Sequence, residues 1–398
     1  MRVDRFKEYF AVATLLLVVI YIAFMGLGVP DSLFGAAWPA IYRDLNVPVG
    51  WASIISVMMA AGTVVSSLNA ARVAQRFGTA KVTLVSTLLA AIAMLGFSVS
   101  RHFALLIVFS LPIGFGAGAI DVVLNNYVAL HYKASHMNFM QCCYGIGVAV
   151  SPYLMSMALS KAANWNQGYF MAFWLQAGIT AMLLLSLPLW KKVNHNGKAQ
   201  EEAQTVVPTK ELLKNKNLRI ACIMCIATCG LEFLCGGWGA TFLVETRNIS
   251  VDLGAKLIIA FYLGMTLSRL LAGFIADKLK SWKLIFIAEG ITAVGVIVLL
   301  IPNTFCAVMG LFLVGFNAIL APNILYLAPE DFGAEISQSV SGLELAAMYV
   351  GVLGMPALFG ILTRFLPVSV FPIYAAGVFA ILLYTTVALK KGLSKKEK

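Results

Sequence analysis

Charged residues are scarce in this sequence. Asp, Glu, Lys and Arg together make up 12% of its 398 residues, and 60% of the residues are hydrophobic. A soluble domain carries about 25% charged residues, so this composition excludes a soluble enzyme or binding domain. The apolar runs are long and continuous, whereas a membrane β-barrel would show short segments of alternating hydrophobicity. We therefore predict an all-α integral membrane protein.

Patterns that mark catalysis or metal binding are also lacking. The four histidines fall near the ends of apolar runs or in loops. Cys222 and Cys225 form a C-x-x-C pair, but no second pair or histidine set completes a metal site. No nucleophile–base pair or phosphate-binding loop is recognisable. The sequence therefore predicts no enzyme activity, no metal site and no cofactor.

Twelve apolar runs are long enough to cross a bilayer, which requires about 20 residues of helix. An even number of spans places both chain ends on the same side of the membrane. We expect membrane-spanning helices at 10–38, 51–71, 82–100, 103–130, 137–160, 168–190, 218–244, 254–276, 283–301, 304–328, 335–362 and 367–389.

The distribution of positive charge predicts the orientation of these spans. The net charge of +11 could suggest nucleic acid as a partner, but most of the 29 lysines and arginines lie in alternate loops, on one side of the predicted membrane. By the positive-inside rule this side is cytoplasmic. We expect a multi-pass protein of the plasma (inner) membrane with both termini in the cytoplasm, with the lipid bilayer and not nucleic acid as its partner.

The one long polar stretch, 191–217, is basic and lies near the middle of the chain. We interpret it as a cytoplasmic linker between two six-helix bundles, at 1–190 and 218–398. An internal repeat supports this division, since "ARVAQRFGTAK" at 71–81 follows the second span and "GFIADKLKSWK" at 273–283 follows the eighth. Such a repeat is typical of transporters built from two similar bundles.

The second copy of the repeat resembles the loop motif of the major facilitator superfamily. In that motif a glycine is followed, after three residues, by an aspartate and a basic residue, which here are Gly273, Asp277 and Lys278. Arg269, four residues before the glycine, fits the motif as well. The resemblance implies twelve helices in two pseudo-symmetric six-helix bundles and a function in transport.

The first copy of the repeat departs from this motif. Ala71 stands in place of the glycine and Gln75 in place of the acid, while Arg76 keeps the basic position. In the family the acid helps to latch the two halves on the cytoplasmic side. The resemblance therefore implies no such latch from the acid position of the first copy.

Five acidic residues lie inside the predicted spans, away from the terminal residue of any span. A carboxylate at the centre of a membrane helix costs about 3 kcal/mol, and such residues usually face a cavity and mark a pathway or a proton relay. Asp31, Asp121, Glu232 and Glu344 are therefore candidates for proton coupling. The alternative is that each caps a helix or pairs with a buried donor. Glu289 lies near an interface where a lysine could pair with it, and we expect a structural role.

The helices that carry the first two acids are not simple rods. Pro30 and Pro39 each remove a backbone donor from the first span and favour a kink or break there. In the fourth span Gly114 and Gly118 lie one helical turn apart, which permits close contact with another helix. Both features indicate helices shaped around a site.

A closer resemblance is to the fucose–galactose–glucose symporter group of the superfamily. Asp31 follows a glycine-rich stretch, and Asp121 and Asn125 share a helix face. In that group an acid in span 1, an acid in span 4 and an asparagine one turn later serve sugar binding and proton coupling. The stretch "GLEFLCGGWGATF" at 230–242 resembles the group's seventh span, which adds Glu232 and Trp238.

Further polar and aromatic residues inside the spans are candidates for contact with a substrate. Amide side chains offer both the donors and the acceptors that a polyol needs, and aromatic rings can stack on the apolar face of a sugar. Each of these residues could instead serve packing or anchor the chain at the membrane interface. The candidates are Asn125, Asn126, Gln141, Tyr144, Trp38, Trp238, Asn317 and Asn323.

Together these patterns predict a secondary active transporter. We expect a monomer that moves a small polar organic solute, a monosaccharide, with protons by alternating access. The site would then open to each side of the membrane in turn. Two alternatives remain open, namely sodium-coupled solute uptake and a proton-driven exporter of amphipathic compounds.

Overall fold

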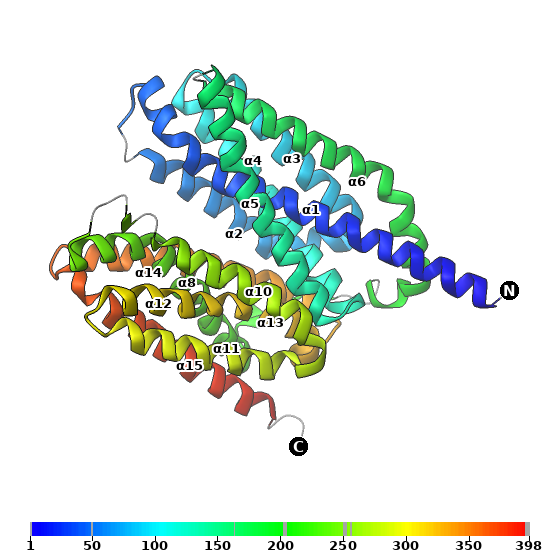
Figure 1. Ribbon diagram of the computed structural model, residues 1–398. Helices are drawn as coiled ribbons and strands as arrows, with labels where there is room; N and C mark the ends of the chain where they lie inside the picture. Colours follow the sequence, from blue (N-terminus) through cyan, green and yellow to red (C-terminus); the bar gives the residue numbers. More distant parts are fainter. Residues whose placement is uncertain are drawn as a thin grey trace. The chain divides into compact units, whose positions relative to one another are not determined.

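The computed structural model describes residues 2–48, 51–162, 164–201, 205–249, 253–254 and 257–394. Within these ranges every regular element is a helix (Figure 1). A bilayer favours this class because a helix bonds its backbone N–H and C=O groups within one segment. The predicted all-α class is confirmed.

Among the residues that the structure describes, twelve helical segments are long and apolar enough to cross a membrane, which confirms the predicted number. A further short helix, α7 (Thr209–Leu212), lies between the sixth and seventh of them. The twelve segments are formed by α1 (Arg2–Asp44), α2 (Ala52–Phe77), α3 (Thr79–Val99), α4 (Phe103–His131), α5 (Ala134–Ala162), α6 (Trp165–Glu201), α8 (Lys216–Arg247), α10 (Ile259–Leu279), α11 (Ser281–Leu299), α12 (Thr304–Val314) with η2 (Gly315–Ile319) and α13 (Leu320–Phe332), α14 (Ser337–Leu362), and η3 (Val368–Val370) with α15 (Phe371–Ser394).

The chain divides into two compact units. Unit 1 comprises residues 1–130, 140–206 and 334–342, and unit 2 comprises residues 131–139, 207–333 and 343–398. The start of α5 therefore belongs to unit 2, and the start of α14 belongs to unit 1. These two helices are the fifth spans of the first and second halves of the sequence.

An apolar cluster in unit 1 joins the end of α1 to α3, α4 and α6. Its large rings lie close together, with 6.3 Å between the ring centroids of Trp38 and Phe103 and 4.8 Å between those of Phe97 and Tyr169. Buried aromatic side chains contribute large apolar areas to a core. The cluster therefore fixes the part of α1 that follows Asp31.

Helices α2 and α4 of unit 1 approach each other closely. A Cβ atom on Gly114 would collide with the carbonyl oxygen of Met59, and one on Gly118 would collide with the carbonyl oxygen of Thr63. Small residues allow membrane helices to pack backbone against backbone. The predicted close contact through these two glycines is confirmed, and its partner is α2.

Helices α1 and α5 of unit 1 touch in the same way. A Cβ atom on Gly147 would collide with the carbonyl oxygen of Met25, and one on Gly28 would collide with the carbonyl oxygen of Tyr144. Each helix thus contributes a glycine where the other presents its backbone. The two helices cannot separate or rotate here without losing this contact.

Helix α1 continues through both of its prolines, so the expected break in the first span is wrong. Pro30 cannot donate to the carbonyl of Gly26 one turn earlier, but the bonds on either side keep the segment helical. The irregular span lies in unit 2 instead, where a 3₁₀ turn over Gly315–Ile319 separates α12 from α13. Such a turn inside a helix often marks a hinge or functional position.

We predict that Gly147→Ala destabilises the protein, whereas Gly145→Ala does not. The new methyl group at position 147 would be forced against the α1 backbone, and overpacking of this kind costs about 1–3 kcal/mol. A Cβ atom on Gly145 meets nothing within 4 Å. Thermal unfolding of both variants in detergent measures the difference, and equal melting temperatures would contradict the close contact.

Candidate functional site

Asp31 lies on α1 in unit 1, and its side chain is exposed. The hydroxyl of Tyr144, on α5, donates a hydrogen bond of 2.6 Å to its Oδ2. Tyr144 is half-buried, and its ring makes an edge contact with Phe24 at 6.4 Å between centroids. Because the α1 and α5 backbones touch next to these residues, the acid and the phenol are held opposite each other. The structure thus brings together two residues that were predicted separately.

A second contact between α1 and α5 lies beside this acid. Pro152 has no N–H and leaves the carbonyl of Val148 without its usual helical donor. The hydroxyl of Ser32 donates to that carbonyl at 2.6 Å, and its oxygen lies 2.5 Å from the hydroxyl of buried Ser151. Because Ser32 has only one hydrogen to give, Ser151 is the donor between the two hydroxyls. These bonds fix α1 at the residue next to Asp31.

Asp121 on α4 is paired with Asn125 one turn later. The Nδ2 of Asn125 lies 2.5 Å from the Oδ1 of Asp121 and 2.8 Å from its main-chain carbonyl oxygen, and it donates to both. The predicted shared helix face of these two residues is confirmed. Asn125 is fully buried, and its Oδ1 has no partner among the described residues.

The two acids of unit 1 interact electrostatically. Within the described part of the chain, neither Asp31 nor Asp121 forms an ion pair with a lysine, arginine or histidine. Their hydrogen-bond donors, Tyr144 and Asn125, are neutral. Unit 1 therefore contains two neighbouring carboxyl groups without a counter-ion.

The other candidates of unit 1 have different surroundings. Asn126 is buried, and its Oδ1 accepts a hydrogen bond of 2.7 Å from Ser337 at the start of α14. Trp38 packs in the apolar cluster, 5.4 Å from the ring of Phe34. Gln141 is half-buried and makes no side-chain hydrogen bond to the rest of the described chain. Substrate contact by these three residues stays a prediction.

In unit 2, Glu232 of α8 forms an ion pair with Arg269 of α10. The Nη2 of Arg269 lies 3.3 Å from the Oε1 of Glu232, and its Nε donates to the carbonyl of Ala318 in η2 at 3.4 Å. The arginine and glutamate side chains are 11% and 10% exposed. A residue assigned to the loop motif is thus the partner of a candidate coupling acid. The sequence did not predict this pair, because its members lie on different helices.

We predict that Glu232→Gln alone destabilises the protein strongly. It leaves the guanidinium of Arg269 buried without its counter-ion, and breaking a buried pair on one side costs about 3–5 kcal/mol. The double variant Glu232→Gln/Arg269→Gln leaves no unpaired charge and should recover part of this loss. Melting temperatures of the two single variants and the double variant test this, and strictly additive losses would contradict the pairing.

Glu344 of α14 is buried in unit 2, and its Oε2 has no hydrogen-bond partner among the described residues. The thiols of Cys222 and Cys225 on α8 are close enough to interact with it electrostatically. The carboxyl of Asp331 on α13 is also close enough to interact with it, and none of these groups is a cation. Its role in proton coupling stays a prediction.

The remaining candidates of unit 2 bond to main-chain carbonyls. The Nδ2 of Asn317, in η2, donates to the carbonyl of Thr228 on α8 at 2.8 Å. The Nδ2 of Asn323 donates at 2.8 Å to a carbonyl one turn earlier on its own span. Half-buried Trp238 donates through Nε1 to the carbonyl of Pro356 at 3.1 Å. Contact of these three side chains with a substrate stays a prediction.

The acid of the second loop motif caps a helix. The Oδ1 of Asp277 accepts from the backbone N–H of Ser135 at 3.0 Å, and its Oδ2 accepts from the Ser135 hydroxyl at 2.9 Å. Ser135 lies in the first turn of α5, where a negative charge complements the helix dipole. A side chain on Gly273 would collide with the ring of Phe139 in the same turn. The motif thus seats the start of α5 on α10 within unit 2.

The basic residues of the two motif copies are exposed. Arg76 lies over the ring of its neighbour Phe77, with 5.4 Å between the guanidinium carbon and the ring centroid. Lys278 makes no hydrogen bond or ion pair to the rest of the described chain. The role of both residues in conformational change stays a prediction.

We predict that Asp277→Ala lowers the stability of unit 2 by about 0.5–2 kcal/mol, which is the usual cost of losing a helix cap. Lys278→Gln is the matched control, because it changes the adjacent exposed residue. Thermal unfolding and proteolysis near the start of α5 measure the effect. If both variants behave alike, the cap does not hold α5.

Glu289 of α11 does not pair with a lysine, so the expected lysine partner is wrong. The hydroxyl of Thr386 on α15 donates to its Oε1 at 2.5 Å, and Oε2 has no partner among the described residues. Lys390, one turn after Thr386, lies over the ring of Trp282 instead, at 4.7 Å from the ring centroid. The ring of Trp282 attracts the ammonium group of Lys390. This lysine does not pair with the buried carboxyl of Glu289.

Sequence reasoning missed the hydroxyl pair that joins α1 to α5. Ser32 directly follows a candidate acid, and Ser151 directly precedes a proline in another span. A proline in a membrane helix frees a carbonyl that a nearby hydroxyl can satisfy. That rule identifies serines beside prolines as candidates, although it does not predict which helix supplies the donor.

Comparison with known proteins identifies related chains. Residues 16–356 match the family described as the Major Facilitator Superfamily. The glucose/mannose transporter GlcP of Bacillus subtilis is 20% identical, with 77% of this chain and 78% of that protein covered. The 3-(3-hydroxy-phenyl)propionate transporter of Escherichia coli is 23% identical, with 79% and 77% covered, and "Bypass of stop codon protein 6" of Saccharomyces cerevisiae is 21% identical, with 88% and 78% covered.

Solved structures resemble the whole fold. The proton:xylose symporter XylE matches with a TM-score of 0.77 at 12% identity, covering 97% of this chain and 96% of that chain. The Escherichia coli fucose:proton symporter FucP matches with a TM-score of 0.75 at 14% identity, covering 94% and 98%. At these identities the likeness concerns the fold. The predicted fold, twelve helices of the major facilitator type, is confirmed.

Proposed function

Because the chain belongs to the Major Facilitator Superfamily, we propose that it is a secondary transporter that carries a monosaccharide together with protons. The observation that carries this proposal is the pair of acids in unit 1. Asp31 and Asp121 interact, and neither has a counter-ion within the described part of the chain. An unpaired carboxylate inside a membrane is costly, and binding a proton removes its charge. A carboxyl that binds and releases a proton in turn couples the proton gradient to solute movement.

The groups beside these acids support a solute that carries hydroxyl groups. The Oδ1 of Asn125 has no partner in the described chain, and the half-buried amide of Gln141 makes no hydrogen bond there. Together with the hydroxyl of Tyr144 they offer both donors and acceptors, as a sugar requires. The relative named as a glucose/mannose transporter supports the same substrate class, and the solved structures with the same fold include a proton:xylose and a fucose:proton symporter.

We further propose that the protein works as a monomer in the plasma (inner) membrane, with both termini in the cytoplasm. The excess of lysine and arginine in alternate loops supports this orientation. Alternating access of one central site to the two sides of the membrane is the mechanism expected for a chain built from two similar halves.

Sodium is the alternative coupling ion, because carboxylate and carbonyl oxygens suit it as well. Export of an amphipathic compound is the alternative direction. The relative named as a 3-(3-hydroxy-phenyl)propionate transporter adds an aromatic acid to the solutes to be screened. One assay in proteoliposomes separates these possibilities, because the solute and the ion gradient can be varied independently.

We predict that a monosaccharide added outside proteoliposomes causes alkalinisation of the external medium, and that Asp121→Asn abolishes this signal. The amide cannot take up a proton, while its shape and its bond to Asn125 are preserved. The variant should still exchange labelled sugar for unlabelled sugar, because exchange needs no net proton movement. A pH-sensitive dye and sugar counterflow are the two measurements.

Asp44→Asn is the matched control for this substitution. Asp44 ends α1, and its Oδ2 accepts from the indole of Trp165 at 2.9 Å, a bond that an asparagine oxygen can also accept. The control should keep both proton movement and exchange. If Asp121→Asn still moves protons with sugar, Asp121 is not the coupling acid. If no sugar shows counterflow in the unsubstituted protein, the sugar proposal fails.

A further inference from the structure

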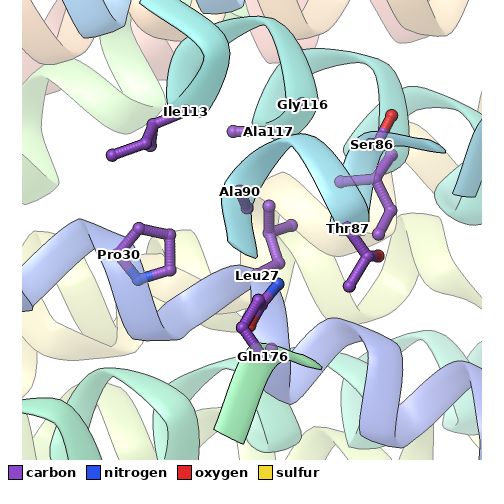
Figure 2. Close-up of a pocket in the computed structure, with 11 residues that line it drawn as sticks. Leu27, Pro30, Ser86, Thr87, Ala90, Ile113, Gly116, Ala117 and Gln176 are labelled. Carbon is purple, nitrogen blue, oxygen red and sulfur yellow. The ribbon is translucent and has the colours of Figure 1, made fainter. Parts of the chain in front are cut away.

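A small cavity lies inside unit 1 between α1, α3, α4 and α6 (Figure 2). Its volume is about 10 Å³, which is room for about one water molecule. Leu27 and Pro30 of α1 form part of its mainly apolar wall, and Ser86, Thr87 and Gln176 are its polar members.

The side chain of Gln176 is the unusual feature of this cavity. It is 2% exposed, and its Oε1 has no hydrogen-bond partner among the described residues. Figure 2 shows it reaching from α6 towards Leu27 of α1. A Cβ atom placed on Gly26 would lie 3.2 Å from the Oε1 of Gln176 and 3.5 Å from its Nε2. A buried amide oxygen without a partner costs about 1–3 kcal/mol.

A second acceptor at the same place also needs a donor. Pro30 has no N–H, so it cannot bond to the carbonyl of Gly26 one turn earlier on α1. Gly26 lines the cavity and lies against the amide of Gln176. The amide oxygen of Gln176 and the carbonyl that Pro30 leaves without its helical donor thus belong to two residues, on different helices, that line the same cavity.

We propose that this cavity binds one ordered water molecule that donates to the amide oxygen of Gln176 and to the carbonyl of Gly26. Water has two hydrogens and so satisfies both acceptors at once, and the hydroxyl of Ser86 on the same wall can donate to the water oxygen. Buried water typically makes about three such bonds. The molecule replaces the helical bond that Pro30 cannot make, and it ties α6 to the carbonyl of Gly26 on α1, five residues before Asp31. This inference does not depend on the transported solute or on the coupling ion.

A water molecule fits the lining better than a metal cation does. The residues around the cavity include no carboxylate, and the Oγ1 of Thr87 already donates to the carbonyl of Thr83 at 2.9 Å. Most of the remaining wall is apolar, whereas a hard cation such as Mg²⁺ or Ca²⁺ takes about six oxygen ligands or more. The wall therefore provides too few oxygens to replace the hydration shell of a cation.

Hydroxyl-radical footprinting by X-ray radiolysis of the full chain in lipid nanodiscs tests the proposal. Radicals form from water at the site, so a buried side chain beside a bound water is oxidised faster than an equally buried side chain without one. Leu27 and Leu17 are matched, since both lie on α1 and both are 7% exposed. We expect Leu27 to be modified about threefold faster or more, given one water in contact with it. Equal rates would show a dry cavity and overturn the proposal.

Two further measurements complete the test, one on variants of Gln176 and one in a different salt. Gln176→Leu removes the amide and fills the space, so modification of Leu27 should fall to the rate of Leu17; Gln176→Met serves if the leucine variant does not fold. A fast rate that persists in these variants would overturn the role of Gln176. Replacing choline chloride by sodium chloride should leave the rate of the unsubstituted protein unchanged. A loss of labelling with sodium would assign the site to the cation instead of water.

Discussion

Inside a bilayer no solvent is available to the backbone, and this constraint governs the parts of the structure that carry chemistry. Each proline in a spanning helix frees one carbonyl, and that carbonyl must find a donor elsewhere. On α5 the carbonyl freed by Pro152 receives the hydroxyl of Ser32 from α1. On α1, Gly26, whose carbonyl Pro30 leaves without its helical donor, lies against the amide of Gln176 from α6. In the first case the substitute donor comes from a neighbouring helix, so the local defect becomes a bond between two helices.

Asp31 and Asp121 of unit 1 have different bonding partners from Glu232 of unit 2. In unit 1, Asp31 and Asp121 are bonded only to neutral donors, and Asp31 is exposed. In unit 2, Glu232 has a cation, which itself reaches a carbonyl in the 3₁₀ turn η2. A carboxyl with neutral partners can change its charge without leaving a buried cation unpaired, whereas one partner of a buried ion pair cannot. Asp31 and Asp121 are therefore better suited to titration than Glu232, and the pair of Glu232 with Arg269 is suited to holding α8, α10 and η2 together.

Much of the fold could be predicted from the sequence, because the signals involved are local. The twelve spans follow from long apolar runs, the helical class from their length, and the α2–α4 contact from two glycines one turn apart. The pairing of Asp121 with Asn125 also follows from helical spacing. Partners on different helices could not be predicted in this way. Tyr144 on Asp31 and Arg269 on Glu232 depend on how the helices rotate against each other, which small residues and packing decide. The prolines of α1 were also misleading, because the helical bonds on either side of Pro30 remain and α1 stays continuous.

The hydrogen bond between Tyr144 and Asp31 also has a consequence for selectivity. It joins two helices whose backbones are in contact. The hydroxyl of Tyr144 therefore already occupies the carboxylate of Asp31, and a ligand would have to compete with it. A ligand hydroxyl that reaches the carboxylate must displace the phenol or share the acid with it, and a ligand with one donor gains little by exchanging one hydrogen bond for another. A ligand that brings several hydroxyl groups can engage the acid and the released phenol together. In the proposed function, this contact would discriminate between ligands by the number and spacing of their polar groups.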